Sequence, residues 1–125
     1  MINTSDLYFK TFNVDVKGQV TAKEIKEYFI NYINNHLFED LSLDNISETF
    51  YISKTHLTRK FKKYTGSTVW DYILTKRLLY AKELLKNGEK PTDVYVDCGF
   101  NDYCSFYRAY KLKFNLPPKD DYNKK

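Results

Sequence analysis

Apolar residues recur at intervals of three and four positions along most of this 125-residue chain, which is the spacing of one face of an α-helix. The first such run begins at Thr21, where Thr21 and Glu24 have the spacing of a capping box, and it reaches Leu37. Further runs predict a short helix over 43–50 and a long amphipathic helix over about 68–87. No segment has a convincing strand pattern, so an all-α fold is expected.

The ends of the chain differ from the helical middle. Residues 1–20 lack the helical pattern and are expected to form a flexible N-terminal arm or linker. Pro91 opens a short helix, because proline has no N–H to leave unsatisfied in a first turn, and Gly99 makes the turn that follows. Pro118 lies just beyond the last helical run, so a frayed tail is expected over 119–125.

A ten-residue pattern occurs twice, at 53–62 and at 102–111. Each copy begins with a good helix N-cap, Ser53 or Asp102, and then has a large apolar residue, an arginine, an aromatic residue and a lysine at the same offsets. The apolar and aromatic residues are four positions apart and share one helix face, and the opposite face is basic. Each copy follows a short helix and a tight turn, which is the anatomy of a helix-turn-helix unit. A helix with a core face and a basic face suits a DNA groove.

The charge is unevenly distributed and follows this repeat. The net charge of +4 divides into −4 over residues 1–48 and +8 over residues 49–125. Two windows contain no acidic residue, 49–70 with five basic residues and 103–119 with four. An ordinary solvated basic face is one explanation, but two windows that coincide with the repeat favour binding to a polyanion.

Other classes of protein fit the sequence poorly. No apolar run approaches the ~20 residues of a transmembrane helix, and the N-terminus lacks a signal-peptide layout, so a cytoplasmic protein that does not bind membranes is expected. Cys98 and Cys104 form neither a disulfide framework nor a zinc-site spacing, and Cys98 is expected to be buried. There is no glycine-rich phosphate loop and no nucleophile–base pair, so we expect neither an enzyme nor a cofactor or metal site.

The residues above resemble the AraC/XylS family of bacterial transcription regulators, over about residues 22–118. In the first half the resemblance is carried by Leu43, Ile46, Ser47, Ile52-Ser53, Leu57, Arg59, Phe61-Lys62-Lys63, Gly66 and Tyr72-Ile73. In the second half it is carried by Arg77, Leu78, Ala81, Leu84, Leu85, Gly99-Phe100, Asp102, Phe106, Arg108, Tyr110-Lys111 and Pro118. Three positions depart from the family pattern, namely Tyr95 in place of Ala or Gly, Asn115 in place of Gly, and Asp121 in place of Tyr.

The resemblance implies a homeodomain-like, AraC-type DNA-binding domain over 21–118, in which one long helix joins two helix-turn-helix subdomains. The first unit would occupy about 21–66, the connecting helix about 68–87 and the second unit about 91–118. It also implies binding to double-stranded DNA at promoters, often to activate transcription, with RNA polymerase as a further candidate partner.

The length of the connecting helix fits a reader of two grooves. About 19 residues span roughly 28 Å at ~1.5 Å per residue, and successive major grooves on one face of DNA lie about 34 Å apart. A monomer would therefore be sufficient for DNA binding, and a dimer is also compatible with the sequence.

We call the helix predicted at the first copy of the repeat, 53–62, the first reading helix, and the helix predicted at 102–111 the second reading helix. In the first, Arg59 is the main candidate for a base contact, because arginine reads guanine O6 and N7 with a bidentate fork. Thr55 and His56 are candidates for polar or methyl contacts to bases, and Thr58 for a thymine methyl. Ser53 is expected to cap the helix and to touch phosphate. The remaining basic residues are expected to contact phosphates and set the register, namely Lys54, Lys62 and Lys63.

In the second reading helix, Arg108 is the counterpart of Arg59, and Asp102 is the capping residue. Tyr107 is large for a groove position and is a candidate for stacking along a sugar. A helix that touches only the backbone is the alternative to base reading here. The other residues expected around Arg108 are Tyr103, Cys104 and Ser105, with Lys111 toward the DNA backbone. A separate arginine, Arg77, lies near the apolar stripe, where a structural ion pair is favoured over a phosphate contact.

Several questions stay open at the level of the sequence. A protein-interaction or antagonist module on the same fold, with weakened DNA readout, is the alternative function. The sequence is compatible with activation and with repression of the target promoter. The chain fits either a stand-alone regulator or the C-terminal part of a larger one.

Overall fold

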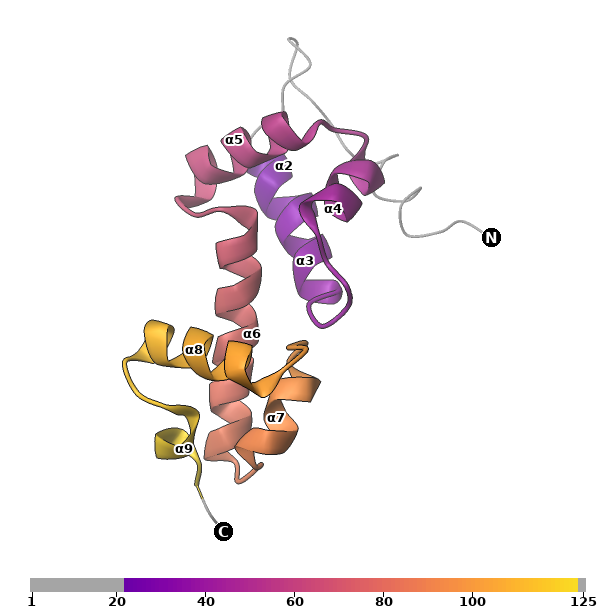
Figure 1. Cartoon of the computed structure of the whole chain (residues 1–125). Helices are drawn as coiled ribbons and strands as arrows, with labels where there is room; N and C mark the ends of the chain where they lie inside the picture. The colour runs from indigo at the N-terminus through magenta and orange to yellow at the C-terminus, as the bar shows by residue number, and fades with distance from the viewer. Residues whose placement is uncertain (1–21, 124–125) are drawn as a thin grey trace. The chain divides into compact units, whose positions relative to one another are not determined.

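The computed structural model describes residues 22–123, and all its regular elements are helices (Figure 1). The expected arm over 1–20 and the capping residue Thr21 lie outside this range. In chain order the helices are α2 (Ala22–Glu24), η1 (Ile25–Ile30), α3 (Asn31–Asn35), α4 (Leu43–Phe50), α5 (Lys54–Thr65), α6 (Val69–Lys86), α7 (Pro91–Asp97), α8 (Tyr103–Phe114) and α9 (Pro118–Asp121). The prediction of an all-α fold is therefore confirmed. The described residues fall into two compact units, one made of 22–37 with 41–72 and one made of 38–40 with 73–123.

The first unit begins with one helical stretch over α2, η1 and α3. The backbone stays in the right-handed helical region at Glu24 and at Asn31, on either side of the π-helical segment η1. The centre of the apolar face predicted from the spacing is buried at Ile25, Phe29 and Ile33, and Phe29 packs edge-on against Phe50 of α4 with the ring centroids 4.4 Å apart. The π-helical turn itself is not visible in the periodicity, because it adds a residue to one turn without breaking the helix.

The helix-turn-helix of the first unit is formed by α4 and α5 (Figure 1). Ser42 caps α4 by accepting a hydrogen bond from the backbone N–H of Asn45, at 3.0 Å. Tyr51 ends α4 in the left-handed region, with φ 56°, which is uncommon for a bulky residue. Gly66 ends α5 with φ 80°. The buried side of the pair is apolar, and its fully buried members are Ile46, Phe50, Leu57 and Phe61.

The second unit is built on α6, against which α7 and α8 pack. Its core contains Leu78, Ala81, Leu85, Val94, Cys98, Phe106 and Tyr110, all buried. Pro91 occupies the first turn of α7, and Gly99 makes the turn toward α8 with φ 86°. Asn115 ends α8 in the left-handed region at φ 62°. Asparagine tolerates that conformation, so this departure from the family's glycine preserves the helix end.

The C-terminal residues differ from the expected frayed tail over 119–125. Residues 118–121 form α9, and the hydroxyl of Tyr110 donates a hydrogen bond to the Asp121 carboxylate. The Nζ atom of Lys82 lies 3.7 Å from the same carboxylate, and the backbone N–H of Asn123 donates to the carbonyl of Leu85 at 3.0 Å. These contacts come from residues far away in the sequence, so local composition gave no sign of them. Residues 124 and 125 lie outside the described range.

Candidate nucleic-acid interface

The first reading helix, α5, divides into a buried face and an exposed basic face. Ser53 caps it by accepting a hydrogen bond from the backbone N–H of His56 at 3.1 Å, which holds the first turn in place. Leu57 and Phe61 are fully buried and fix the helix on the unit's core. The predicted contact residues that point to solvent are Lys54, Thr55, Thr58, Arg59, Lys62 and Lys63. Arg59 is exposed, and among residues 22–123 no salt bridge to it occurs.

Two α5 side chains are less exposed than the pattern suggests. His56 is half-buried and its Nε2 atom is covered by protein, so a base contact would have to use the rest of the ring. Lys60 is only 8% exposed, a burial that the sequence analysis missed. The sequence does contain a sign of this burial: Lys60 lies three residues after Leu57, and that spacing puts it at the edge of the buried face. A lysine stem can cover apolar surface there.

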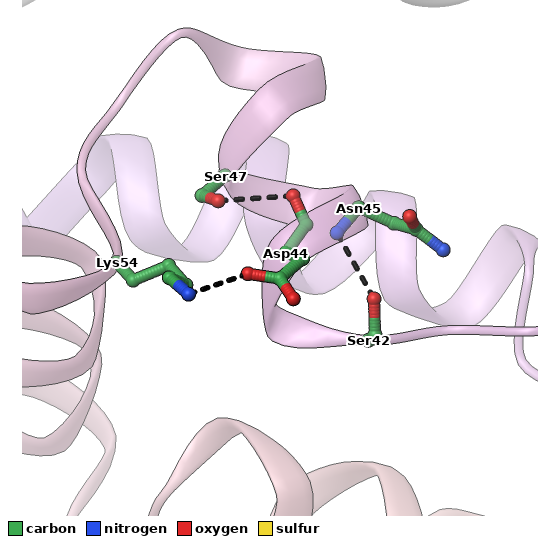
Figure 2. A network of polar contacts seen from close by, with 5 residues as sticks. All are labelled: Ser42, Asp44, Asn45, Ser47 and Lys54. Carbon is green, nitrogen blue, oxygen red and sulfur yellow. Dashed lines mark hydrogen bonds and ion pairs between the residues drawn. The ribbon is translucent and has the colours of Figure 1, made fainter.

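Lys54 forms an ion pair within the helix-turn-helix. Its Nζ atom lies 2.7 Å from the Oδ1 atom of Asp44, in the first turn of α4, as Figure 2 shows. The hydrogen bond to Asp44 raises the pKa of Lys54. Both side chains are well exposed, so solvent weakens the pair, and its main effect is to orient the start of α5 against α4. Sequence reasoning missed Asp44, which lies beside a residue predicted to bind phosphate.

The polar groups around Asp44 fix the α4 end of this pair (Figure 2). The Ser47 hydroxyl donates to the backbone carbonyl of Asp44 at 3.0 Å, and Ser42 caps the same turn through Asn45. Asp44 therefore sits in a helix turn that is held at two points. A phosphate approaching Lys54 would have to share the ammonium with this carboxylate or displace it.

The second reading helix, α8, has the same buried and exposed division but a different chemistry on its exposed face. Cys104, Arg108 and Lys111 are exposed, and Tyr103 and Tyr107 are half-buried. An open hollow of about 350 Å³ lies on this face, and it is lined by Tyr103, Cys104, Tyr107 and Arg108. The structure thus brings four of the predicted contact residues together at one place.

Asp102 and Ser105 are engaged with each other at the start of α8. The backbone N–H of Ser105 donates to Oδ1 of Asp102 at 2.7 Å, and the Ser105 hydroxyl donates to Oδ2 at 2.9 Å. These hydrogen bonds hold the pKa of Asp102 below its usual value. An ionised carboxylate repels phosphate, so the geometry gives Asp102 the role of a cap.

Arg77 is buried in the second unit and not directed toward a ligand. It is 7% exposed, and its Nη2 atom donates to the backbone carbonyl of Glu39 at 2.8 Å. Burial lowers its pKa, and the negative charge of Asp40 opposes that shift. The sequence favoured a structural ion pair for Arg77; the burial and the hydrogen bond to a backbone carbonyl support a structural role, and the ion pair stays a prediction.

Three other kinds of feature were sought among the described residues: a reactive cysteine, a metal site and a membrane-spanning helix. Cys98 is fully buried, and burial raises the pKa of its thiol to about 12. Among residues 22–123, no three His, Cys, Asp or Glu side chains gather where they could hold a metal ion. Within the same range, no helix has the length and apolar character needed to cross a membrane.

Comparisons with known proteins place this geometry in a family. The family model for a helix-turn-helix domain matches residues 46–123. The regulatory protein SoxS of Escherichia coli K12 is 31% identical over 102 residues, which cover 81% of this chain and 95% of SoxS. The transcriptional activator RhaS of Escherichia coli O139:H28 is 32% identical over 90 residues, which cover 71% of this chain and 32% of RhaS. A solved Chromobacterium violaceum regulator with an AraC-type DNA-binding domain matches with a TM-score of 0.67 at 29% identity, over 74% of this chain and 83% of its own.

Proposed function

The chain belongs to the AraC/XylS family of DNA-binding transcription regulators, and from this premise we propose that it reads promoter DNA with α5 and α8, each in a major groove, and activates transcription. The observation that carries the proposal is the matched placement of Arg59 and Arg108. Each is exposed, and each lies six residues after a side-chain cap and on the face opposite two buried residues. A capped helix with an exposed arginine on the face away from the core is suited to base edges in the major groove.

The exposed residues of α5 divide into two roles in this proposal. Arg59 reads a guanine, and Thr55 and Thr58 lie beside it at the bases. Lys62 and Lys63, near the end of the helix, neutralise phosphates and set the register. Lys54 positions α5 through Asp44, and it adds a phosphate contact only when a phosphate shares its ammonium with that carboxylate or displaces the carboxylate.

Two reading helices on one chain make a monomer sufficient for binding. The adjacent major grooves of one DNA face are the proposed targets, with α5 in one and α8 in the next. Activation requires a second partner, and RNA polymerase is the candidate. The similarity to RhaS, which is named a transcriptional activator, supports an activating role. The proposed location of the protein is the cytoplasm, in association with the nucleoid, because DNA and RNA polymerase are available there.

Selection from a random pool of double-stranded DNA, at two salt concentrations, tests the proposal first. Two short enriched blocks about one helical turn apart are expected. On the selected site, Arg59→Ala should lose about 1–3 kcal/mol of binding free energy and the preference at one base pair. The matched control is Lys62→Ala, which should weaken all sequences alike and reduce the slope of log K against log salt by about one. An unchanged sequence preference in Arg59→Ala would show that α5 does not read bases.

The competing function is a protein-interaction module that has lost DNA readout. Exposed apolar side chains in the second unit favour it, since Leu112 of α8 is 85% exposed and Val96 of α7 is 59% exposed. The salt dependence separates the two functions. Binding through several phosphates weakens steeply as salt rises, and association through an apolar surface does not.

A further inference from the structure

The two reading helices differ at the positions beside their arginines. Counted from the caps, Lys54, Thr55 and Thr58 of α5 correspond to Tyr103, Cys104 and Tyr107 of α8. The α5 residues are an ammonium and two hydroxyls, all exposed. The α8 residues are two aromatic rings and a thiol, and with Arg108 they line the open hollow of about 350 Å³. The surface next to Arg108 is therefore mainly apolar.

Packing behind the hollow holds its walls in place. The ring of Tyr103 meets the ring of Tyr95 edge-on, with centroids 5.7 Å apart and planes at 85°. It also lies 5.9 Å from the buried ring of Phe106 and 6.4 Å from the ring of Tyr107. Tyr95, which departs from the family's small residue, thus supports the first wall of the hollow. Such a surface is formed before any ligand arrives.

The chemistry of the major groove limits what can enter an apolar hollow on this helix. Base edges there present hydrogen-bond donors and acceptors, and the one apolar group among them is the C5 methyl of thymine. Asp102 caps this helix with a carboxylate, but the chain carries no acid from 103 to 119, and Arg108 and Lys111 are the charges on this face that attract a polyanion.

We propose that the hollow lined by Tyr103, Cys104 and Tyr107 receives a thymine methyl, while Arg108 contacts a neighbouring base. This rests on the proposed function, and it assigns the specificity of the second reading helix to apolar contact. The first helix offers mainly polar groups beside the bases, namely the Arg59 guanidinium and the hydroxyls of Thr55 and Thr58, and its one candidate for a thymine methyl contact, Thr58, is not part of an apolar hollow. The two halves of the target site should therefore respond differently to removal of methyl groups.

Deoxyuridine tests this directly, since it keeps the hydrogen-bonding edge of thymine and lacks only the methyl. In the selected site, each thymine of the second block is replaced singly by deoxyuridine, and binding of the full chain is measured. One replacement should weaken binding about fourfold, the factor that corresponds to one buried methyl-sized group.

Variants of the chain then assign that effect to the hollow. Tyr107→Ala should reduce the thymine-to-deoxyuridine ratio to about one, whereas Tyr107→Phe, which keeps the ring, should preserve it. Cys104→Ser changes the hollow's polarity at nearly constant size and should lower the ratio partway. The effect of deoxyuridine in the first block should be unchanged in all three variants, which controls for general loss of folding.

The proposal is overturned if no thymine of the second block is sensitive, or if Tyr107→Ala keeps the full ratio. Enrichment of a single block would also overturn it, because α8 would then contact only the backbone or stack on a sugar. An absence of any enriched block is a different result, since it would refute sequence-specific binding by the whole chain.

Discussion

Replacement of Gly99 by alanine tests how the second unit positions its reading helix. Gly99 forms the turn between α7 and α8 at φ 86°, where a side chain costs roughly 1–2 kcal/mol. An added Cβ would also lie 3.2 Å from Cζ of Arg77, closer than side chains normally approach. Arg77 has little room to move, because it is buried and donates to the Glu39 carbonyl at 2.8 Å. The guanidinium has to shift by a few tenths of an ångström, and a shift that breaks the charged hydrogen bond would add roughly 1.5–3 kcal/mol.

Gly66→Ala is the matched control. Gly66 ends α5 at φ 80°, and an added Cβ there meets no atom within 4 Å. That substitution should cost only the backbone term of roughly 1–2 kcal/mol. The excess cost of Gly99→Ala, about 1.5 kcal/mol or more, therefore measures the Arg77 contact.

Urea unfolding followed by two signals measures both costs. Trp70, the only tryptophan, belongs to the first unit, so its fluorescence follows that unit, while far-UV circular dichroism follows all helices. Gly99→Ala should shift the dichroism transition more than the fluorescence transition, and Gly66→Ala should shift the fluorescence transition. Equal free-energy losses in the two variants would show that Arg77 moves aside freely, and would refute its role as a fixed support of the α7–α8 turn.

Three further predictions follow from single contacts. Asp102→Ala should destabilise the second unit, because it removes the cap of α8. Folding lowers the pKa of Asp102, so its contribution to stability is present above the unfolded pKa and is lost as the pH falls through the folded pKa; urea titrations at several pH values measure this loss. Asp44→Asn should release Lys54 to phosphate, so that binding to non-specific DNA strengthens and its salt slope steepens by about one, and an unchanged slope would argue against competition at Lys54. Iodoacetamide should modify the exposed Cys104 in the native protein and Cys98 only on unfolding, because burial raises the pKa of Cys98 to about 12; mass spectrometry of the labelled protein distinguishes the two sites.

Local features of this fold were readable from the sequence. Helix caps and helix faces depend on residues three and four positions apart, so Ser53 and Asp102 could be identified as caps, and each forms the expected hydrogen bond. The burial of Leu57 and Phe106 follows from the same short-range spacing. The family resemblance then supplied the pairing of two units, which spacing alone only suggested.

Contacts between distant residues were not readable in the same way. Lys54 and Asp44 are ten positions apart, and the turn between their helices passes through a left-handed conformation at Tyr51. Nothing in the composition marks Tyr51 for that role, since glycine or asparagine is the usual choice there. The direction of a long side chain such as Lys54 is also set by its partner more than by its place on the helix.

The three departures from the family pattern in the second half are each matched by a local contact. Asn115 keeps the left-handed end of α8, and Tyr95 packs edge-on against Tyr103. Asp121 accepts a hydrogen bond from the hydroxyl of the buried Tyr110. Without this acceptor the hydroxyl would be buried and unsatisfied, at a cost of roughly 1–3 kcal/mol. The same burial and the nearby carboxylate raise the pKa of Tyr110, so it donates this bond across the physiological range. The departures therefore give no reason to regard the second unit as less well folded than the first. Under the proposed function, any difference in DNA binding between α5 and α8 would come from their exposed faces.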